Sequence, residues 1–229
     1  GQTINLAPGD NFVDCASSDV DFAYFGLNVA PGVIIKTSFA DARDLNAEYS
    51  PSNFGHIVIA GRYSLTDSNF VAMSADADFL YVVTAQQGAT ISSVVKYSKK
   101  DFSRIAAYQP QRDWWTMTNI KAITVHDSMI FIAGDAPYVA KLDTRDMALV
   151  GISALFKDSE TQLRAISTDG VDVYVSVGQS GTQRIVRLRV HDLQRRGAFL
   201  FDGKQDNHAE DDGHTEVFVH RRGHVYTSQ

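Results

Sequence analysis

The chain has 229 residues, 44% of them hydrophobic and 21% charged, which is enough apolar material for a large folded core and excludes a disordered chain. Lys and Arg total 21 against 27 Asp and Glu, and the resulting net charge of −6 excludes the broad basic field that nucleic acid requires. Cys15 is the single cysteine, so an internal disulfide, a zinc-thiolate site and a CxxC redox pair are excluded as well.

The sequence predicts no membrane segment. Its longest apolar runs fall short of the roughly 18 residues that a membrane-spanning helix needs. Residues 1–5 show neither the basic region nor the apolar region of a signal peptide. We therefore expect a mature or trimmed soluble domain with no membrane insertion.

A short strand built around an aromatic residue recurs five times along the chain. The aromatic positions are Tyr24, Tyr81, Phe131, Tyr174 and Tyr226. They are separated by 57, 50, 43 and 52 residues, and each is flanked by residues that favour β-strands. A repeat of about 50 residues indicates one supersecondary unit copied along the chain.

The strand after each of the first four aromatic strands ends on a basic residue, and an aspartate follows five positions later. The basic residues are Lys36, Lys96, Lys141 and Arg187, and the aspartates are Asp41, Asp101, Asp146 and Asp192. We expect the basic side chain to project from one face of its strand. The aspartate is expected to accept backbone N–H groups in the turn that begins the next strand.

Two further strands complete each unit. Alternating runs precede the aromatic strands, at residues 71–76, 120–125 and 163–168, and closing strands are predicted at residues 56–60, 103–108, 148–152 and 197–201. Each unit is therefore predicted to be a four-stranded antiparallel meander, whose copies stack face to face around an axis. Helix is expected at most as a single turn within residues 40–48.

The repeat resembles the YVTN and NHL-like β-propeller repeats. Residues 22–26 followed by residues 33–36, and residues 130–134 followed by residues 138–143, carry this resemblance, which extends over residues 12–229. It implies an all-β propeller fold, in a group that includes protein-binding platforms, glycan-binding lectins and a minority of enzymes. The second copy departs from the pattern at Val83 and Thr84, where other copies have glycine.

We expect one propeller domain, with five blades or as part of a larger propeller. The predicted blades are residues 12–61, 70–109, 118–156 and 163–203, with a partial blade at residues 214–229 that residues 1–8 complete. In a closed ring of five blades, residues 3–7 supply one strand beside the last two.

The candidate ligand-binding residues lie in a predicted loop between two blades. They are Arg112, Asp113, Trp114 and Trp115, and they include both tryptophans of the chain. Adjacent indoles beside a charged pair suit stacking on a sugar ring or anchoring of a protein partner. The alternative is that one indole fills the space between two blades and the other covers it.

No catalytic residue, metal site or cofactor is predicted. Residues 202–214 carry five carboxylates and two imidazoles, a set that suits a cation, yet they match neither an EF-hand loop nor an HExxH motif and also fit a solvated acidic loop. No GxSxG elbow, P-loop or helix-opening GxGxxG is present. His56, His126 and His191 fall at strand ends and turns, and Cys15 is expected to be a buried, inert thiol.

The sequence favours a non-catalytic binding module that uses one propeller face for protein–protein interaction or adhesion. We expect an extracellular or cell-surface location, and a cytoplasmic location is the alternative. A protein partner is expected and a glycan is the alternative ligand; nucleic acid is not expected. A lectin predicts near-equivalent pockets in several blades. A metal-dependent hydrolase or lyase predicts carboxylates that converge at the channel mouth.

Overall fold

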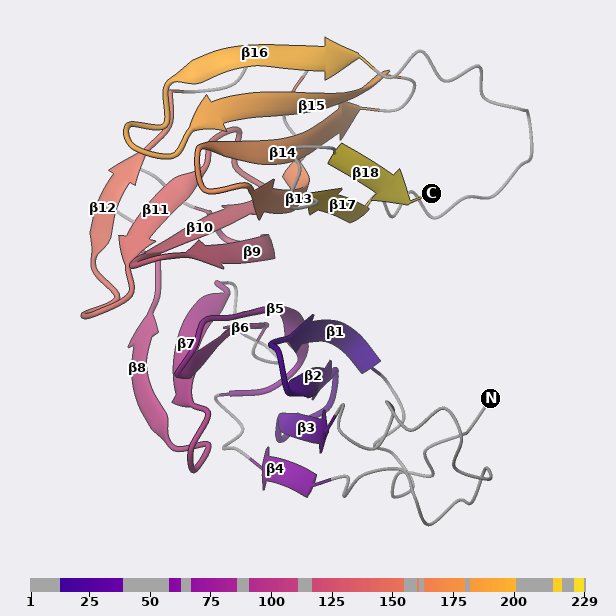
Figure 1. Cartoon of the computed structure of the whole chain (residues 1–229), viewed down its shortest axis with the longest axis vertical. Helices are drawn as coiled ribbons and strands as arrows, with labels where there is room; N and C mark the ends of the chain where they lie inside the picture. Colours follow the sequence, from indigo (N-terminus) through magenta and orange to yellow (C-terminus); the bar gives the residue numbers. More distant parts are fainter. Residues whose placement is uncertain are drawn as a thin grey trace. The chain divides into compact units, whose positions relative to one another are not determined.

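The computed structural model describes residues 13–38, 58–62, 67–85, 91–110, 117–154, 160, 163–179, 182–200, 216–219 and 225–228. These residues form eighteen β-strands and no helix (Figure 1). The all-β class predicted by the repeat is therefore confirmed for the described part of the chain. No helix within these ranges is long and apolar enough to cross a membrane.

The strands form four antiparallel sheets of four strands and one of two strands. The first sheet consists of β1 (Val13–Ser18), β2 (Phe22–Leu27), β3 (Val33–Ser38) and β4 (Val58–Arg62). The second consists of β5 (Phe70–Ala75), β6 (Phe79–Thr84), β7 (Ser93–Ser98) and β8 (Arg104–Tyr108). The third consists of β9 (Ile120–His126), β10 (Met129–Gly134), β11 (Ala140–Asp143) and β12 (Leu149–Ile152). The fourth consists of β13 (Leu163–Thr168), β14 (Asp172–Gln179), β15 (Thr182–Arg189) and β16 (Arg195–Leu200). The two-stranded sheet pairs β17 (Glu216–Val219) with β18 (Val225–Ser228).

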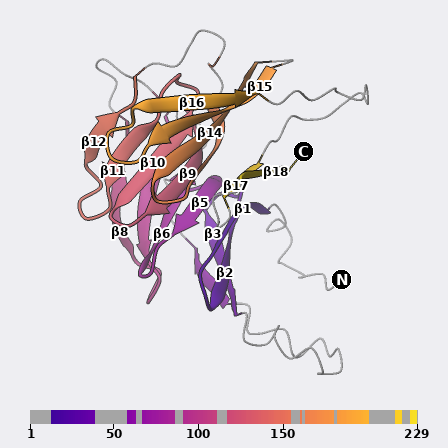
Figure 2. The same cartoon turned by 45° about the horizontal axis from the view of Figure 1, so that its top comes forward.

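Each four-stranded sheet is a meander, because its strands lie in the order in which they occur along the chain (Figures 1 and 2). This arrangement confirms the predicted repeat unit. The predicted helical turn at residues 40–48 and the predicted strand at residues 3–7 lie outside the described residues.

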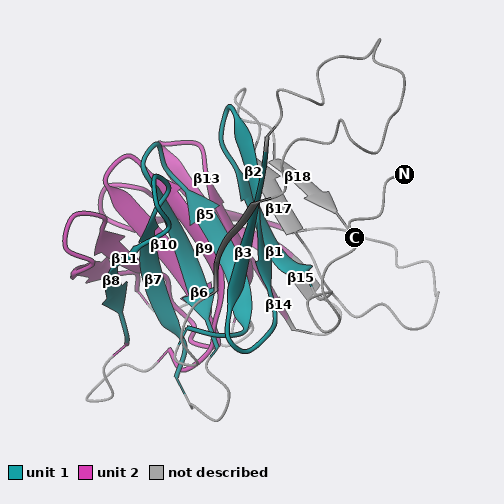
Figure 3. Ribbon diagram, turned by 90° about the horizontal axis from the view of Figure 1, so that it is seen from below, with its two compact units in different colours: residues 1–109 teal, residues 110–229 magenta. Residues whose placement is uncertain are grey.

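The chain divides into two compact units, residues 1–109 and residues 110–229 (Figure 3). The first unit holds the first and second sheets, and in it β1 and β2 lie against β5. The second unit holds the third and fourth sheets and the two-stranded sheet, and in it β9 lies against β13 and β13 against β17. In each unit, consecutive sheets therefore meet through their first strands.

Each unit has its own apolar core between two sheets. In the first unit, Tyr24 and Ile34 of the first sheet pack against Leu80, Val82 and Tyr97 of the second. In the second unit, an equivalent cluster joins the third sheet to the fourth through Phe131, Val139, Val173, Val175 and Val186. Burial of this apolar surface is the main stabilising contribution in both units.

The predicted aromatic and basic residues are direct cross-strand partners. Tyr24 pairs with Lys36 and Tyr81 with Lys96. Phe131 pairs with Lys141, and Tyr174 pairs with Arg187. Side chains directly opposite in an antiparallel pair lie on the same face. The aromatic residue and the basic residue of each sheet therefore share one face. In the first and third sheets this face, through Tyr24 and Phe131, packs on the next sheet of the same unit.

The predicted role of the turn aspartate is confirmed in the three sheets where it is described. Asp101, Asp146 and Asp192 each accept, on Oδ1, the backbone N–H of the residue two positions later, at 3.1, 2.9 and 3.0 Å. The residue between them has a positive φ of 56° to 60° and is apolar: Phe102, Met147 and Leu193. Asp41 lies outside the described residues.

Candidate functional site

A second aspartate organises the turn between the first two strands of three sheets. Asp19 accepts the backbone N–H groups of Asp21 and Phe22 on Oδ1, at 2.9 and 2.8 Å, and the Tyr24 hydroxyl on Oδ2, at 2.9 Å. Three hydrogen bonds to one carboxylate fix both the turn and the aromatic side chain.

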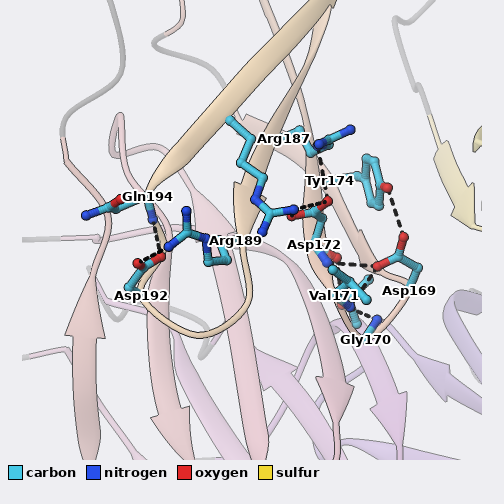
Figure 4. Close-up of polar contacts among 11 residues, drawn as sticks. Asp169, Gly170, Val171, Asp172, Tyr174, Arg187, Arg189, Asp192 and Gln194 are labelled. Carbon is cyan, nitrogen blue, oxygen red and sulfur yellow. Dashed lines mark hydrogen bonds and ion pairs between the residues drawn. The ribbon is translucent and has the colours of Figure 1, made fainter.

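The same arrangement recurs in the second and fourth sheets. Asp76 accepts the Tyr81 hydroxyl at 2.7 Å and two N–H groups at 2.9 and 2.7 Å. Asp169 accepts the Tyr174 hydroxyl at 2.9 Å and two N–H groups at 2.8 Å (Figure 4). The sequence shows this pattern as an aspartate five residues before Tyr24, Tyr81 and Tyr174, a spacing that was not among the predicted features of the repeat.

The third sheet departs from the pattern at both positions together. Phe131 replaces the tyrosine and His126 replaces the aspartate. Phenylalanine has no hydroxyl to donate, so no carboxylate is required there. The His126 ring lies instead against Gly170 of the fourth sheet, where a Cβ would be 2.7 Å from its Nε2.

In the first unit, the corresponding region between the two sheets is hollow. The hollow has a volume of about 520 Å³ and is formed by the β1–β2 turn, β2, β3, the β5–β6 turn and the turn that follows β7. Its charged lining residues are Asp19, Asp21, Asp78, Lys36, Lys99 and Lys100, and its aromatic lining residues are Phe22, Tyr24 and Phe79. Three carboxylates and three ammonium groups make the lining close to neutral.

Lys99 connects the two sheets along one side of the hollow. Its Nζ donates to the carbonyl oxygens of Asp76 and Ala77, at 2.8 and 3.2 Å, and forms an ion pair with Oδ2 of Asp19. The Lys99 side chain is only 9% exposed, so this ion pair is largely shielded from water.

The hydrogen bonds to Asp19 shift its titration. Burial alone would raise the pKa of this carboxyl, but the hydrogen bonds from Lys99, from two backbone N–H groups and from Tyr24 outweigh it and lower the pKa to about 2. Burial and the neighbouring Asp19 carboxylate raise the pKa of Tyr24 well above its usual value. At neutral pH this side of the hollow therefore holds a charged carboxylate and a neutral phenol.

Lys36 lies across the hollow and is held by aromatic rings. Its Nζ is 3.6 Å from the centre of the Phe22 ring and within about 6 Å of the Tyr24 and Phe102 rings. Cation–π contacts of this kind hold an ammonium group in place without a hydrogen-bond acceptor.

The equivalent lysine of the second unit is placed differently. Nζ of Lys141 donates to the carbonyl oxygens of Val190 and His191, both at 3.0 Å, in the β15–β16 turn of the neighbouring sheet. Burial lowers the pKa of Lys141, although the carboxylate of Asp192 acts in the opposite direction. Lys141 therefore bridges two sheets at the place where Lys36 leaves the first unit open.

The residues predicted as a ligand site, Arg112, Asp113, Trp114 and Trp115, lie outside the described residues, as do residues 202–214 and His56. Cys15 is buried as predicted, and burial raises its thiol pKa to about 12, which leaves it protonated and unreactive at neutral pH. Within the described ranges, no group of three or more His, Cys, Asp or Glu residues is placed to hold a metal ion.

No family model and no curated protein matches the chain. Among solved structures, it is similar to hydrazine synthase from Kuenenia stuttgartiensis, with a TM-score of 0.59 and 14% identity over 87% of this chain and 51% of that one. It is similar to glutaminyl cyclase from Myxococcus xanthus, with a TM-score of 0.54 and 11% identity over 96% and 86% of the two chains. It is also similar to BamB from Moraxella catarrhalis, with a TM-score of 0.53 and 10% identity over 80% and 47%.

The chain thus spans about half the length of hydrazine synthase and of BamB. At these identities the likeness shows the fold alone, and that fold is propeller-like and all-β.

Proposed function

We propose that this protein is a non-catalytic binding module for a protein partner, and that the hollow of the first unit holds part of that partner. The observation that carries the proposal is the contrast between two equivalent lysines. Lys141 donates to two carbonyl oxygens of the neighbouring sheet, whereas Lys36 stays on the rings of its own sheet and of Phe102 and leaves a hollow of about 520 Å³.

The lining of the hollow suits a peptide segment better than a small ion. Carboxylates and ammonium groups are equal in number there, and Phe22 and Phe79 contribute apolar surface between them. A segment that carries both charge signs around an apolar side chain complements such a lining. A simple anion or cation would meet charges of its own sign.

The proposed test is selection of peptides on the intact chain from a displayed random library, followed by affinity measurements on variants. Phe22→Ala and Lys36→Glu are expected to weaken the selected peptides about tenfold, since each removes a contact of roughly 1 to 2 kcal/mol. Lys121→Glu, which changes an exposed residue of β9 in the second unit, is the matched control. Peptides that bind all of these proteins equally would contradict the assignment to the hollow.

The same peptides also test the site predicted from sequence. Trp114→Ala and Trp115→Ala are expected to weaken binding if the protein partner also contacts the loop at residues 111–116. Glycan binding that disappears in Trp114→Ala, with no peptide selected, would favour the lectin alternative instead.

We also propose that the four-stranded sheets are blades of a propeller, with five blades or as part of a larger one. The similarity to propeller-like BamB supports the blade as the unit. If residues 1–8 pair with the last sheet, their deletion should lower the melting temperature by several degrees. An unchanged melting temperature would count against that closure.

A further inference from the structure

The fourth sheet concentrates arginine in a chain that is acidic overall. Residues 184–196 contain five arginines, one aspartate and no lysine, whereas the whole chain has a net charge of −6. The arginines are Arg184, Arg187, Arg189, Arg195 and Arg196, and they lie on β15, on β16 and beside the turn between them.

The arginines are directed to two faces of the sheet. Arg184 and Arg195 turn to Glu160, which is fully buried and accepts a bidentate pair from Arg195 at 2.5 and 2.8 Å. Arg187 and Arg189 are an odd number of residues away from Arg184 and so project from the other face. On that face Arg187 and Arg196 share the carboxylate of Asp172, at 3.1 and 3.3 Å.

We define the arginine face as Arg187, Arg189 and Arg196 (Figure 4 labels the first two). Its three guanidinium groups contact two carboxylates, because Arg189 pairs with Asp192 at 2.9 Å and the other two share Asp172. Their side chains are 35%, 42% and 33% exposed, so each retains donors that reach solvent. Nε of Arg189 is itself buried and has no hydrogen-bond partner among the described residues, so the donors that reach solvent are on its terminal nitrogens.

The third sheet shows which groups bind the basic side chain at the equivalent position of the repeat. Lys141 lies opposite Phe131 as Arg187 lies opposite Tyr174. Lys141 receives two oxygen acceptors, the carbonyls of Val190 and His191, from the sheet packed against it. The arginine face is the equivalent place on the fourth sheet, where β17 packs against β13 and β14. Oxygen acceptors are therefore the groups that complement the arginine face.

Apolar surface lies beside the arginine face. Phe199, on β16 opposite Ile185, is 54% exposed and shares the face of Arg187. Gly197, directly opposite Arg187, has no atom of the described residues within 4 Å of the position of a Cβ, so these residues leave the surface between Arg187 and Phe199 open. Arginine with an exposed aromatic residue is the composition that is enriched at protein interfaces.

We propose that the arginine face and Phe199 form a docking surface for an acidic segment of a protein partner. Aspartate or glutamate carboxylates of that segment accept hydrogen bonds from Arg189 and Arg196, and an apolar side chain packs on Phe199. Arginine suits this role because its planar guanidinium binds a carboxylate with two parallel hydrogen bonds. A polyphosphate chain is disfavoured, because the acidic remainder of the protein repels it beyond these few arginines.

The proposal is independent of the hollow, which lies in the other unit, and the two can be tested separately. The probe is a fluorescein-labelled peptide of alternating Glu and Leu residues, compared with the same peptide containing Gln in place of Glu. Fluorescence anisotropy at low salt is expected to show binding of the Glu peptide, weakening as salt is raised, and at least tenfold weaker binding of the Gln peptide.

Two substitutions and a matched control locate the site. Arg196→Glu is expected to weaken the Glu peptide about tenfold or more, since a lost charge-assisted contact costs roughly 1.5 to 3 kcal/mol. Phe199→Ala is expected to weaken it several-fold. Arg145→Glu is the control, because Arg145 is 83% exposed and pairs with Asp143 in the turn of the third sheet, as Arg189 pairs with Asp192 in the fourth. The control should change binding less than twofold.

Several results would overturn the proposal. They are equal binding of the Glu and Gln peptides, an equal loss in Arg145→Glu and Arg196→Glu, no binding by the wild-type chain, and tighter binding of heparin or single-stranded DNA than of the peptide. If Arg196→Glu fails to fold, Arg196→Gln against Arg145→Gln decides the same question, with a loss expected only in the first.

Discussion

Cys15 and Gly26 are cross-strand partners on β1 and β2, and they share one small space in the core of the first unit. A Cβ on Gly26 would lie 2.5 Å from Sγ of Cys15, which is closer than atoms can approach. The equivalents of Cys15 in the other sheets are Ala72, Ala122 and Ala165, which face larger residues than glycine. The sulfur therefore fills the volume that glycine leaves.

This relationship predicts coupling between the two positions. Gly26→Ala should destabilise the chain by about 1 to 3 kcal/mol through overpacking. In a Cys15→Ala background the same change should cost clearly less, because the sulfur is gone; the remaining neighbours, Phe70 and Met73, lie at 3.1 and 3.2 Å. Urea unfolding of the two single variants and the double variant gives the coupling energy. Gly151→Ala is the control and should be near neutral, because no atom in the described part of the chain lies within 4 Å of the added Cβ.

Removal of the Tyr174 hydroxyl, which donates a hydrogen bond to Asp169, is predicted to lower the free energy of unfolding. Tyr174→Phe should destabilise the chain by about 1 kcal/mol, the usual net value of such a bond. In an Asp169→Ala background the same change should cost much less, because the acceptor is already absent. Equal costs in the two backgrounds, measured by chemical denaturation, would show that the hydroxyl does not depend on this carboxylate.

The turn carboxylates predict a loss of stability in acid. Burial alone would raise both pKa values, but hydrogen bonds outweigh it: from Lys99, two backbone N–H groups and Tyr24 they lower the pKa of Asp19 to about 2, and from backbone N–H groups and Tyr174 they lower the pKa of Asp169. A carboxyl with a lower pKa in the folded state stabilises the fold above its unfolded pKa and loses that contribution as the pH falls toward the folded value. The free energy of unfolding should therefore decrease between about pH 4 and pH 2. Asp19→Asn should show a smaller decrease over this interval, and an identical slope would contradict the assignment.

Replacement of Asp127 by glycine is predicted to stabilise the chain. It occupies the two-residue turn between β9 and β10 with a φ of 51°, and its side chain is 84% exposed. Glycine adopts a positive φ without the penalty that a Cβ brings, so Asp127→Gly should stabilise the chain by about 0.5 to 1 kcal/mol. Val20→Gly is the contrasting change, since Val20 is exposed in the β1–β2 turn but is not among the residues with positive φ. It should lower the melting temperature while Asp127→Gly raises it.

Much of the fold could be predicted because the sheets repeat residue by residue. The fixed spacing from Lys96 to Asp101 reports a backbone turn whose geometry leaves little freedom, so strand order and turn position follow from the sequence. The sequence also contains a second fixed spacing, the five residues from Asp76 to Tyr81, which corresponds to their hydrogen bond. This spacing is found only when the turns of the repeat are compared, rather than the strands.

The candidate site could not be predicted in the same way. Lys36 and Lys141 have the same place in the repeat, and the sequence gives no sign that one reaches the neighbouring sheet while the other stays over Phe22. That difference depends on side-chain conformation and on what the neighbouring turn offers: Val190 and His191 in one unit, Lys99 and Lys100 in the other. The position of the lysine side chain is therefore determined by packing between sheets rather than by local propensity.

The apolar residues at positive φ, Phe102, Met147 and Leu193, allow distant relatives to be found. A large side chain seldom tolerates this backbone conformation, so its presence directly after a capping aspartate is a rare combination. The motif consists of a basic residue, an aspartate five positions later and a bulky apolar residue directly after the aspartate. Its backbone conformation is known from these three turns. Genome searches with that pattern, repeated at intervals of 40 to 60 residues, should select chains that share this turn even where whole-chain alignment finds no match.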